Sequence, residues 1–171
     1  MYRKANCLSS ETRKTLSMAL IQCHFDYSCS SWYAGVSQKL KNSLQVAQNK
    51  TVRFINNEGP RSSVGQPELA SVGFLNVENR VKQLRLGHTH KIFYNRCPEY
   101  LKEHFIKVNE HHRYNTRSSQ FNFVVPKIRG VDCTSFFYNA ITDWNDLPNE
   151  VKAVKNHDSF KTNLKAFLKC H

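Results

Sequence analysis

One stretch near the end of the chain, SFFYNAITDWNDLP (residues 135–148), constrains the fold more than any other. Its apolar residues recur at offsets of 0, 3, 4 and 7, the spacing of one face of an α-helix. They are Phe137, Ala140, Ile141 and Trp144. Ser135 can cap the start of this helix, and Pro148 ends it because proline has no amide hydrogen to donate. The stretch is therefore predicted to be a core helix rather than a site of chemistry.

The same periodicity predicts helices along most of the chain, and the fold class is therefore mainly α. The helices are expected to start at Ser9 or Ser10, at Ser37, near Val77, after Pro98, at Thr134 or Ser135, and at Asp158 or Ser159. The expected buried faces are Leu16, Ala19, Leu20, Cys23 and Tyr27; Leu40, Leu44, Ala47, Thr51 and Phe54; Val77, Val81, Leu84 and Ile92; and Phe160, Leu164, Phe167 and Leu168. Tyr27 and Trp32 are expected to be core anchors.

Two departures from the helical pattern suggest how the chain is organised. Residues 56–67 collect Gly, Pro, Ser and Asn without periodicity, which is typical of a loop. Apolar residues alternate over 121–125 like a short strand, and Pro126 confines that strand to an edge. We expect a helical hairpin over 1–57, a linker over 58–67, and a helix-rich tail with a minor β element over 68–171.

The charge points to a polyanionic partner. Residues 1–85 carry 12 basic and 5 acidic side chains and residues 86–171 carry 13 and 8, so the two halves have net charges of +7 and +5. The longest apolar runs, such as Met18–Ile21, are far shorter than the roughly 20 residues of a membrane helix. Six cysteines without a C-x-x-C pair indicate a reduced chain. We expect an intracellular protein without a membrane partner, and both nucleus and cytoplasm stay open.

Basic residues that share helix faces, or that alternate with aromatic residues in a loop, are the candidates for contact with RNA or DNA. The helix residues are Lys50 and Arg53; Lys82 and Arg85; and Lys161, Lys165 and Lys169. The loop residues are Arg113, Arg117, Lys127 and Arg129, interleaved with Tyr114, Phe121 and Phe123. The alternatives are an ordinary solvated face for the helices, and for the loop an edge strand whose aromatic residues return to the core.

Catalytic and metal-binding patterns are weaker. Cys23, His24 and Cys29, joined by His88 or His90, could be metal ligands, but zinc normally takes more closely paired ligands. Asp143 and Asp146 share a helix face, where carboxylates more often cap or solvate a helix end than bind a metal. No G-x-S-x-G, P-loop or H-E-x-x-H string occurs. We therefore assign no catalytic residue, no metal ligand and no cofactor.

Short patterns follow one another along nearly the whole chain. They are LIQCHFDYSCSSW (20–32), VAQNKTVRFI (46–55), FLNVENRVKQLRL (74–86), CPEYL (97–101), TRSS (116–119), NFVVPK (122–127), WNDLP (144–148) and SFKTNLKAFL (159–168). In their order they resemble the C-terminal region of a non-LTR (LINE-type, jockey-like) retrotransposon reverse transcriptase. The chain departs from the family at Phe74, Leu75 and Asn76, where the family has tryptophan followed by a Leu-Pro step.

The resemblance implies a thumb-like region over 1–57 and a post-thumb tail that helps to hold template and primer. It also implies that polymerisation belongs to a palm with an aromatic-x-Asp-Asp box and magnesium, whereas no two of the five aspartates here are adjacent. We therefore expect a non-catalytic part of an RNA-directed DNA polymerase. Its expected partners are the RNA or DNA backbone of a template–primer duplex, and the palm and fingers of the parent enzyme.

An alternative from another class is a small helical protein-interaction module derived from a retroelement. It would bind its partner through apolar side chains of the last helix, namely Phe160, Leu164 and Phe167.

Overall fold

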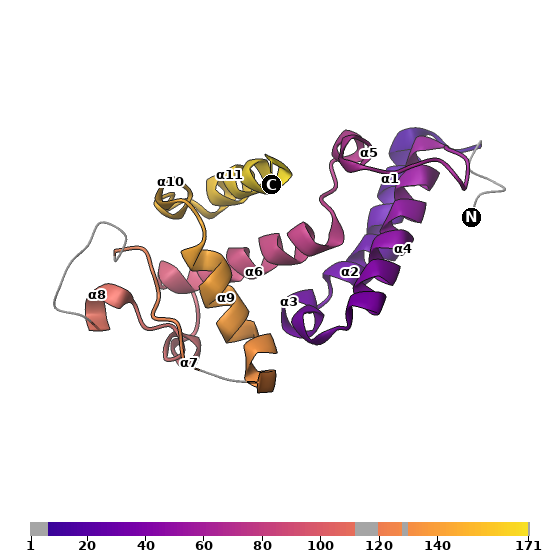
Figure 1. Ribbon diagram of the computed structural model, residues 1–171. Coiled ribbons are helices and arrows are strands. Elements are labelled where there is room, and N and C mark those ends of the chain that lie inside the picture. The colour runs from indigo at the N-terminus through magenta and orange to yellow at the C-terminus, as the bar shows by residue number, and fades with distance from the viewer. Residues whose placement is uncertain (1–6, 112–119, 128–129, 171) are drawn as a thin grey trace. The chain divides into compact units, whose positions relative to one another are not determined.

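The computed structural model describes residues 7–111, 120–127 and 130–170 (Figure 1). The described chain is mainly α-helical with essentially no strands, which confirms the predicted fold class. It divides into two compact units, one of residues 1–29 and 36–81 and the other of residues 30–35 and 82–171. Within the described ranges, no helix is both long enough and apolar enough to cross a membrane.

The first unit is built on the long helix α4. Its elements are α1 (Ser10–Ser17), a π-helical turn η2 (Met18–Gln22), α2 (Cys23–Asp26), α4 (Gln38–Asn56), α5 (Gln66–Val72) and the start of α6 (Val77–Phe93). Helices α1 and α5 both pack against α4. The predicted start of α1 is confirmed, because the Ser9 hydroxyl accepts a hydrogen bond from the amide of Thr12 at 3.2 Å. Ser37 is likewise the residue before α4.

The core of this unit lies between α4 and α5. Val52 and Ile55 of α4 pack with Leu69 and Val72 of α5. Two glutamines of α4 fix the segment that leads into α6: Gln48 Nε2 donates to the carbonyl of Leu75, and Gln45 Oε1 accepts from the amide of Val77, each at 2.9 Å. The loop over 58–67 lies inside this unit.

The predicted buried face of the first helix is wrong. Leu20 is 54% exposed and Tyr27 is 78% exposed, while Arg13 and Ser17 are buried. Ala19 and Cys23 are also exposed, and Leu16 is half-buried. The π-helical turn η2 adds a residue to one turn and so changes the phase from Met18 onward, which a strict 3.6-residue period cannot anticipate. Arg13 and Ser17 precede this turn, and it does not explain their burial.

A polar contact also holds the helix in this orientation. Asp26 accepts hydrogen bonds from Arg80 Nε at 3.0 Å and from a terminal guanidinium nitrogen of Arg80 at 2.8 Å. Other apolar residues are likewise less buried than predicted: Trp32 is 37% exposed and Leu40 is 57% exposed. By contrast, Thr51 and Phe54 of α4 are buried as predicted.

The second unit packs helices around a cluster of aromatic rings. Its elements are the remainder of α6, α7 (Glu99–Lys102), α8 (Val108–His111), η4 (Gly130–Thr134), α9 (Phe136–Asn145), α10 (Asn149–Lys152) and α11 (His157–Cys170), with most of α3 (Cys29–Trp32) and η3 (Tyr33–Gly35). Trp144 of α9 is fully buried, and its ring lies near those of Phe93, Phe123 and Phe160. The prediction that residues 135–148 form a core helix is confirmed.

The expected strand near 121–125 is reduced to one antiparallel bridge between Lys107 and Phe123. Two backbone hydrogen bonds flank it, from Val124 to Ile106 at 2.8 Å and from Val108 to Asn122 at 3.0 Å. Among the described residues, this bridge does not extend into a longer β-ladder.

The end of α9 holds residues 121–123 in place. Trp144 Nε1 donates to the carbonyl of Phe121 at 2.7 Å. The side-chain amide of Asn145 donates to the carbonyl of Phe123 at 2.8 Å and accepts from the amide of Phe123 at 2.9 Å. Two neighbouring residues of the WNDLP pattern therefore bind the backbone of a segment more than 20 positions earlier in the sequence.

Candidate nucleic-acid interface

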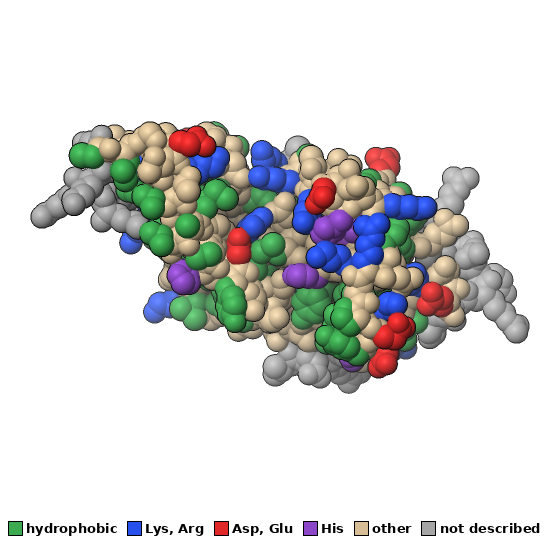
Figure 2. All heavy atoms as spheres, turned by 180° about the vertical axis from the view of Figure 1, so that it is seen from behind, with side chains coloured by type: hydrophobic (Ala, Val, Ile, Leu, Met, Phe, Trp, Pro, Cys, Tyr) green, Lys and Arg blue, Asp and Glu red, His purple; other side chains and the backbone are tan. Residues whose placement is uncertain are grey.

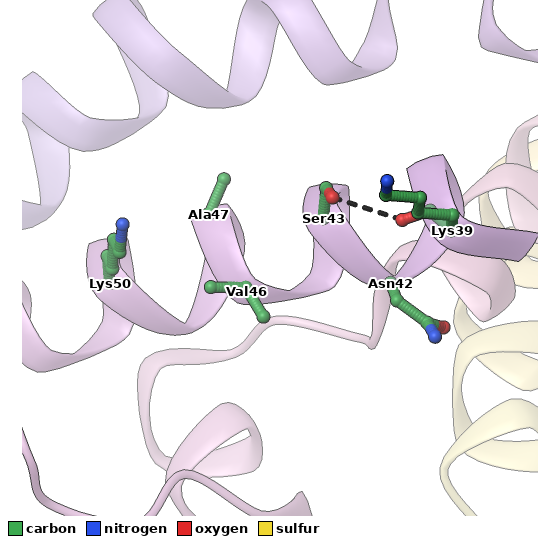
Figure 3. Close-up of a pocket in the computed structure, with 6 residues that line it drawn as sticks. All are labelled: Lys39, Asn42, Ser43, Val46, Ala47 and Lys50. Atoms are coloured by element: carbon green, nitrogen blue, oxygen red, sulfur yellow. Dashed lines mark hydrogen bonds between the residues drawn. The ribbon is translucent and has the colours of Figure 1, made fainter.

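One exposed face of α4 carries lysines at both ends of a shallow hollow (Figure 3). The lining residues are Lys39, Asn42, Ser43, Val46, Ala47 and Lys50. Lys39 and Lys50 are both exposed, and the helical rise of about 1.5 Å per residue separates them by about 16 Å along the axis. Ser43 donates a hydrogen bond to the carbonyl of Lys39 at 3.0 Å. Its hydroxyl proton is therefore used within the helix. Phosphates could be contacted at either end of this face.

Arg53 was predicted to share the basic side with Lys50, but it has a structural partner. Its Nε donates to the carbonyl of Ser62 at 2.7 Å, and the side chain is half-buried. Since this bond ties α4 to the following loop, we leave Arg53 out of the candidate interface.

The basic side predicted for α6 is an ion-pair network. Arg85 is only 8% exposed and binds Asp143 of α9 through Nε at 2.8 Å and a terminal nitrogen at 2.6 Å. Lys82 lies 3.4 Å from the other oxygen of the same carboxylate. We therefore leave Arg85 out of the candidate interface, because its guanidinium is buried and paired with the half-buried carboxylate of Asp143.

The last helix has the two-sided character that its sequence predicts. Phe160, Leu164 and Leu168 are buried, while Lys161 and Lys169 are exposed and Lys165 is half-buried. These three lysines, at i, i+4 and i+8, line a second shallow hollow of about 420 Å³ together with Thr162, Ala166 and Gln83 of α6. Asp158 lies 3.8 Å from Lys161, but both side chains are more than half exposed, which makes this a weak pair.

Arg113, Arg117 and Arg129 lie outside the described residues. Lys127 is exposed. Phe123 is buried, and Phe121 stacks on Phe93 with ring centroids 6.1 Å apart. Phe123 thus follows the alternative in which the aromatic residues return to the core, and half-buried Phe121 packs one side of its ring on Phe93.

Three histidines that the sequence analysis did not assign to this interface lie where α6 meets α11. His90 Nε2 is 2.7 Å from the carbonyl of Val154, and His90 Nδ1 is 3.2 Å from Nδ1 of His157. Because a carbonyl only accepts, His90 carries its proton on Nε2, and His157 must donate from Nδ1. His88 is exposed on α6. The sequence spacing could have identified His157 as a candidate, because it precedes Lys161 by four residues and so extends the α11 lysine row by one helical turn.

The surroundings of these histidines oppose a further positive charge. Burial, with help from nearby Lys161, His90 and Lys91, lowers the pKa of His157 to about 4, although Asp158 acts in the opposite direction. Burial also lowers the pKa of His90. The folded chain therefore favours the neutral form of both imidazole rings.

This arrangement predicts acid sensitivity. The unfolded chain binds more protons than the folded chain below pH 6.5, so the stability contributed by His157 is complete above that pH and is lost as the pH falls toward about 4. The midpoint of urea unfolding, followed by circular dichroism, should fall over this range. His157→Asn keeps a donor near the position of Nδ1 and should show a smaller fall; equal falls in both proteins would contradict this account.

Lys152 is a further residue with a perturbed charge. It is 1% exposed, and burial lowers its pKa to about 8 despite the opposing effect of Asp146. Its Nζ donates to Asn122 Oδ1 at 2.8 Å and to the carbonyl of Asn145 at 2.9 Å. Lys152 therefore supports residues 121–123 from within the core and does not belong to the interface.

The structure brings together no metal site in the part of the chain that it describes. No group of three His, Cys, Asp or Glu side chains there is placed to hold an ion. Cys29 is buried while Cys23 and His24 are exposed, so these three do not share one environment.

Comparisons of the chain with protein-family models, curated proteins and solved structures found no match.

Proposed function

We propose that this chain is a non-catalytic C-terminal part of a retrotransposon RNA-directed DNA polymerase and that it binds RNA or DNA backbones without sequence preference. The observation that supports the proposal best is helix α11, where three lysines at helical spacing run alongside the buried row of Phe160, Leu164 and Leu168. A helix fixed to the core on one side presents its ammonium groups in a constant row. Such a row can follow a series of phosphates.

The type of side chain favours contact with the backbone over reading of bases. Lysine ammonium groups are point charges that pair with phosphate oxygens, whereas base recognition needs bidentate donors or stacking rings. The two hollows are lined mainly by lysines, small residues and amides. Phe123 is buried in the core, and half-buried Phe121 packs on Phe93. Binding is therefore expected to depend on phosphate density rather than on sequence.

The order of local sequence patterns, which resembles the region after the palm of non-LTR reverse transcriptases, supports the parent enzyme that we propose. An intracellular location, with template–primer duplex and the remaining polymerase domains as partners, belongs to the same proposal. The wide spread of basic side chains agrees with a polyanionic partner (Figure 2).

Salt dependence tests this function. The full chain should bind a duplex of about 20 base pairs more weakly as salt is added. If the three α11 lysines each contact one phosphate, the logarithm of the association constant should fall with a slope of about −2.7 against the logarithm of the salt concentration. Affinity would then fall about 40-fold between roughly 50 and 200 mM salt. Fluorescence anisotropy with two duplexes of unrelated sequence should give the same affinity for both. An affinity that does not change with salt, or that differs strongly between the sequences, would argue against the proposal.

The second candidate function is that of a protein-interaction module. Its binding surface would differ from the apolar face of the last helix that the sequence analysis expected. Phe160 and Leu164 are fully buried and Phe167 is half-buried, so α11 has no apolar face to offer. The first unit instead exposes Met18, Leu20 and Tyr27. A partner bound there would not be affected by loss of the α11 lysines, which separates the two candidates.

A further inference from the structure

The lysine row of α11 continues at its N-terminal end into a mixed cluster of histidines and lysines. His157 begins the helix four residues before Lys161. On α6, His88 and Lys91 are three residues apart and both are exposed. The ring of His157 reaches α6 here, because a Cβ added at Gly87 would lie 3.9 Å from Cε1 of His157. On the face shown in Figure 2, histidine side chains lie next to Lys and Arg side chains.

The hydrogen bonds of this cluster leave ring nitrogens available for a ligand. His157 uses Nδ1 to donate to His90, and its Nε2 has no hydrogen-bond partner among the described residues. The side chain of His88 likewise has no hydrogen bond within the described part of the chain. Protonation at Nε2 would keep the Nδ1 donor of His157 in place and add a second donor. The existing bond to His90 is therefore compatible with a charged His157.

Without a bound anion, the surroundings of the cluster disfavour protonation of His88 and His157. Although His88 is exposed at the surface, partial desolvation of its ring by neighbouring side chains lowers its pKa, and the charges of Lys91 and Lys161 act in the same direction. The same two lysines act on His157, together with its neighbour His90, and only Asp158 opposes them. The two histidines are thus affected by the same two lysines, and the carboxylate of Asp158 lies 3.8 Å from Lys161. A phosphate group would offset this repulsion and would favour the protonated histidines.

We propose that His88, Lys91, His157 and Lys161 together bind one phosphate of the nucleic-acid backbone and that the histidines take up protons as it binds. This inference rests on the proposed function, since the phosphate belongs to the same RNA or DNA that the α11 lysines contact. It adds α6 to the interface and makes the affinity dependent on pH. Each proton taken up on binding strengthens the affinity tenfold for every unit that the pH falls, so partial uptake gives a smaller change.

The test compares duplex binding at about pH 5.5 and about pH 7.5 at constant ionic strength, a range in which histidine is the side chain that ordinarily titrates. We expect the unmodified chain to bind about fivefold more tightly at the lower pH. The double variant His88→Gln, His157→Asn should lose most of this difference. The matched control His24→Gln, His104→Gln alters two other exposed histidines and should keep it. Circular dichroism at both pH values checks that each protein is folded.

A second variant and a second measurement keep the inference testable if the double variant does not fold. His88→Gln alone alters an exposed side chain and should still reduce the pH dependence. In addition, NMR titration of the histidine Cε1 protons should show a higher pKa for His88 with the duplex bound. An equal pH dependence in the unmodified chain and in His88→Gln, with an unchanged His88 titration, would overturn the inference. Absence of duplex binding at either pH and at low salt would instead overturn the proposed function.

Discussion

Replacement of Trp144 by alanine should destabilise the second unit by about 3–5 kcal/mol. The indole is fully buried, lies near the rings of Phe93, Phe123 and Phe160, and donates through Nε1 to the carbonyl of Phe121 at 2.7 Å. Alanine would leave a large cavity and would deprive that carbonyl of its partner. Urea unfolding followed by circular dichroism measures the loss.

The chain contains a matched control, since Trp32 is its other tryptophan and is 37% exposed. Trp32→Ala should cost clearly less than Trp144→Ala, because a larger share of its indole is already in solvent and its removal leaves no enclosed cavity. A third variant, Trp144→Phe, keeps most of the ring volume but removes the hydrogen bond, and it should fall between the two. Similar losses for Trp144→Ala and Trp32→Ala would show that the indole of Trp144 is not a core residue.

Charge reversal of the α11 row, Lys161→Glu, Lys165→Glu and Lys169→Glu together, should weaken duplex binding about 100-fold at low salt. Three attractive contacts with phosphates become three repulsive ones. The slope of log affinity against log salt should also become shallower by about 2.7, because about 0.9 is lost for each phosphate contact removed. Fluorescence anisotropy over a salt series gives both quantities.

The control for this variant must change the net charge equally without affecting the row. Arg61, Arg96 and Lys155 are exposed and lie outside both hollows, so their joint replacement by glutamate meets that condition. We expect this control to weaken binding only modestly, through the general field of the protein. If both triple variants lost affinity equally, binding would depend on net charge alone and α11 would not be the interface.

The sequence predicted best those elements whose local signals and tertiary environment agree. Helix α9 has its predicted cap at Ser135, whose hydroxyl accepts from the amide of Tyr138 at 3.3 Å. Of its predicted apolar face, Ala140, Ile141 and Trp144 are buried and Phe137 is half-buried. Helix α11 has its predicted apolar and basic sides. Patterns of this kind need only the helical period and the chemistry of helix ends.

The failures have identifiable physical causes. The face of the first helix was misassigned because a π-helical turn changes the phase at Met18–Gln22 and because Asp26 pairs with Arg80, which is 54 positions away. Arg85 was placed on the surface because nothing local shows that Asp143, from a helix 58 positions later, neutralises it. Long-range polar pairs of this kind determine which candidate residues remain available for a ligand, and helical periodicity does not reveal them.

The side chain of Asn145 also has a consequence for self-association. Phe123 sits at the non-hydrogen-bonded position of its bridge with Lys107, so its own amide and carbonyl point away from that partner, and Asn145 binds both. An incoming extended peptide would find these two groups already occupied, and Pro126 offers no amide hydrogen three residues further on. The run FNFVV, which is rich in aromatic and β-branched residues, is the type of segment that promotes intermolecular sheet growth when exposed. We therefore expect the side-chain amide of Asn145 to oppose intermolecular sheet growth at this edge.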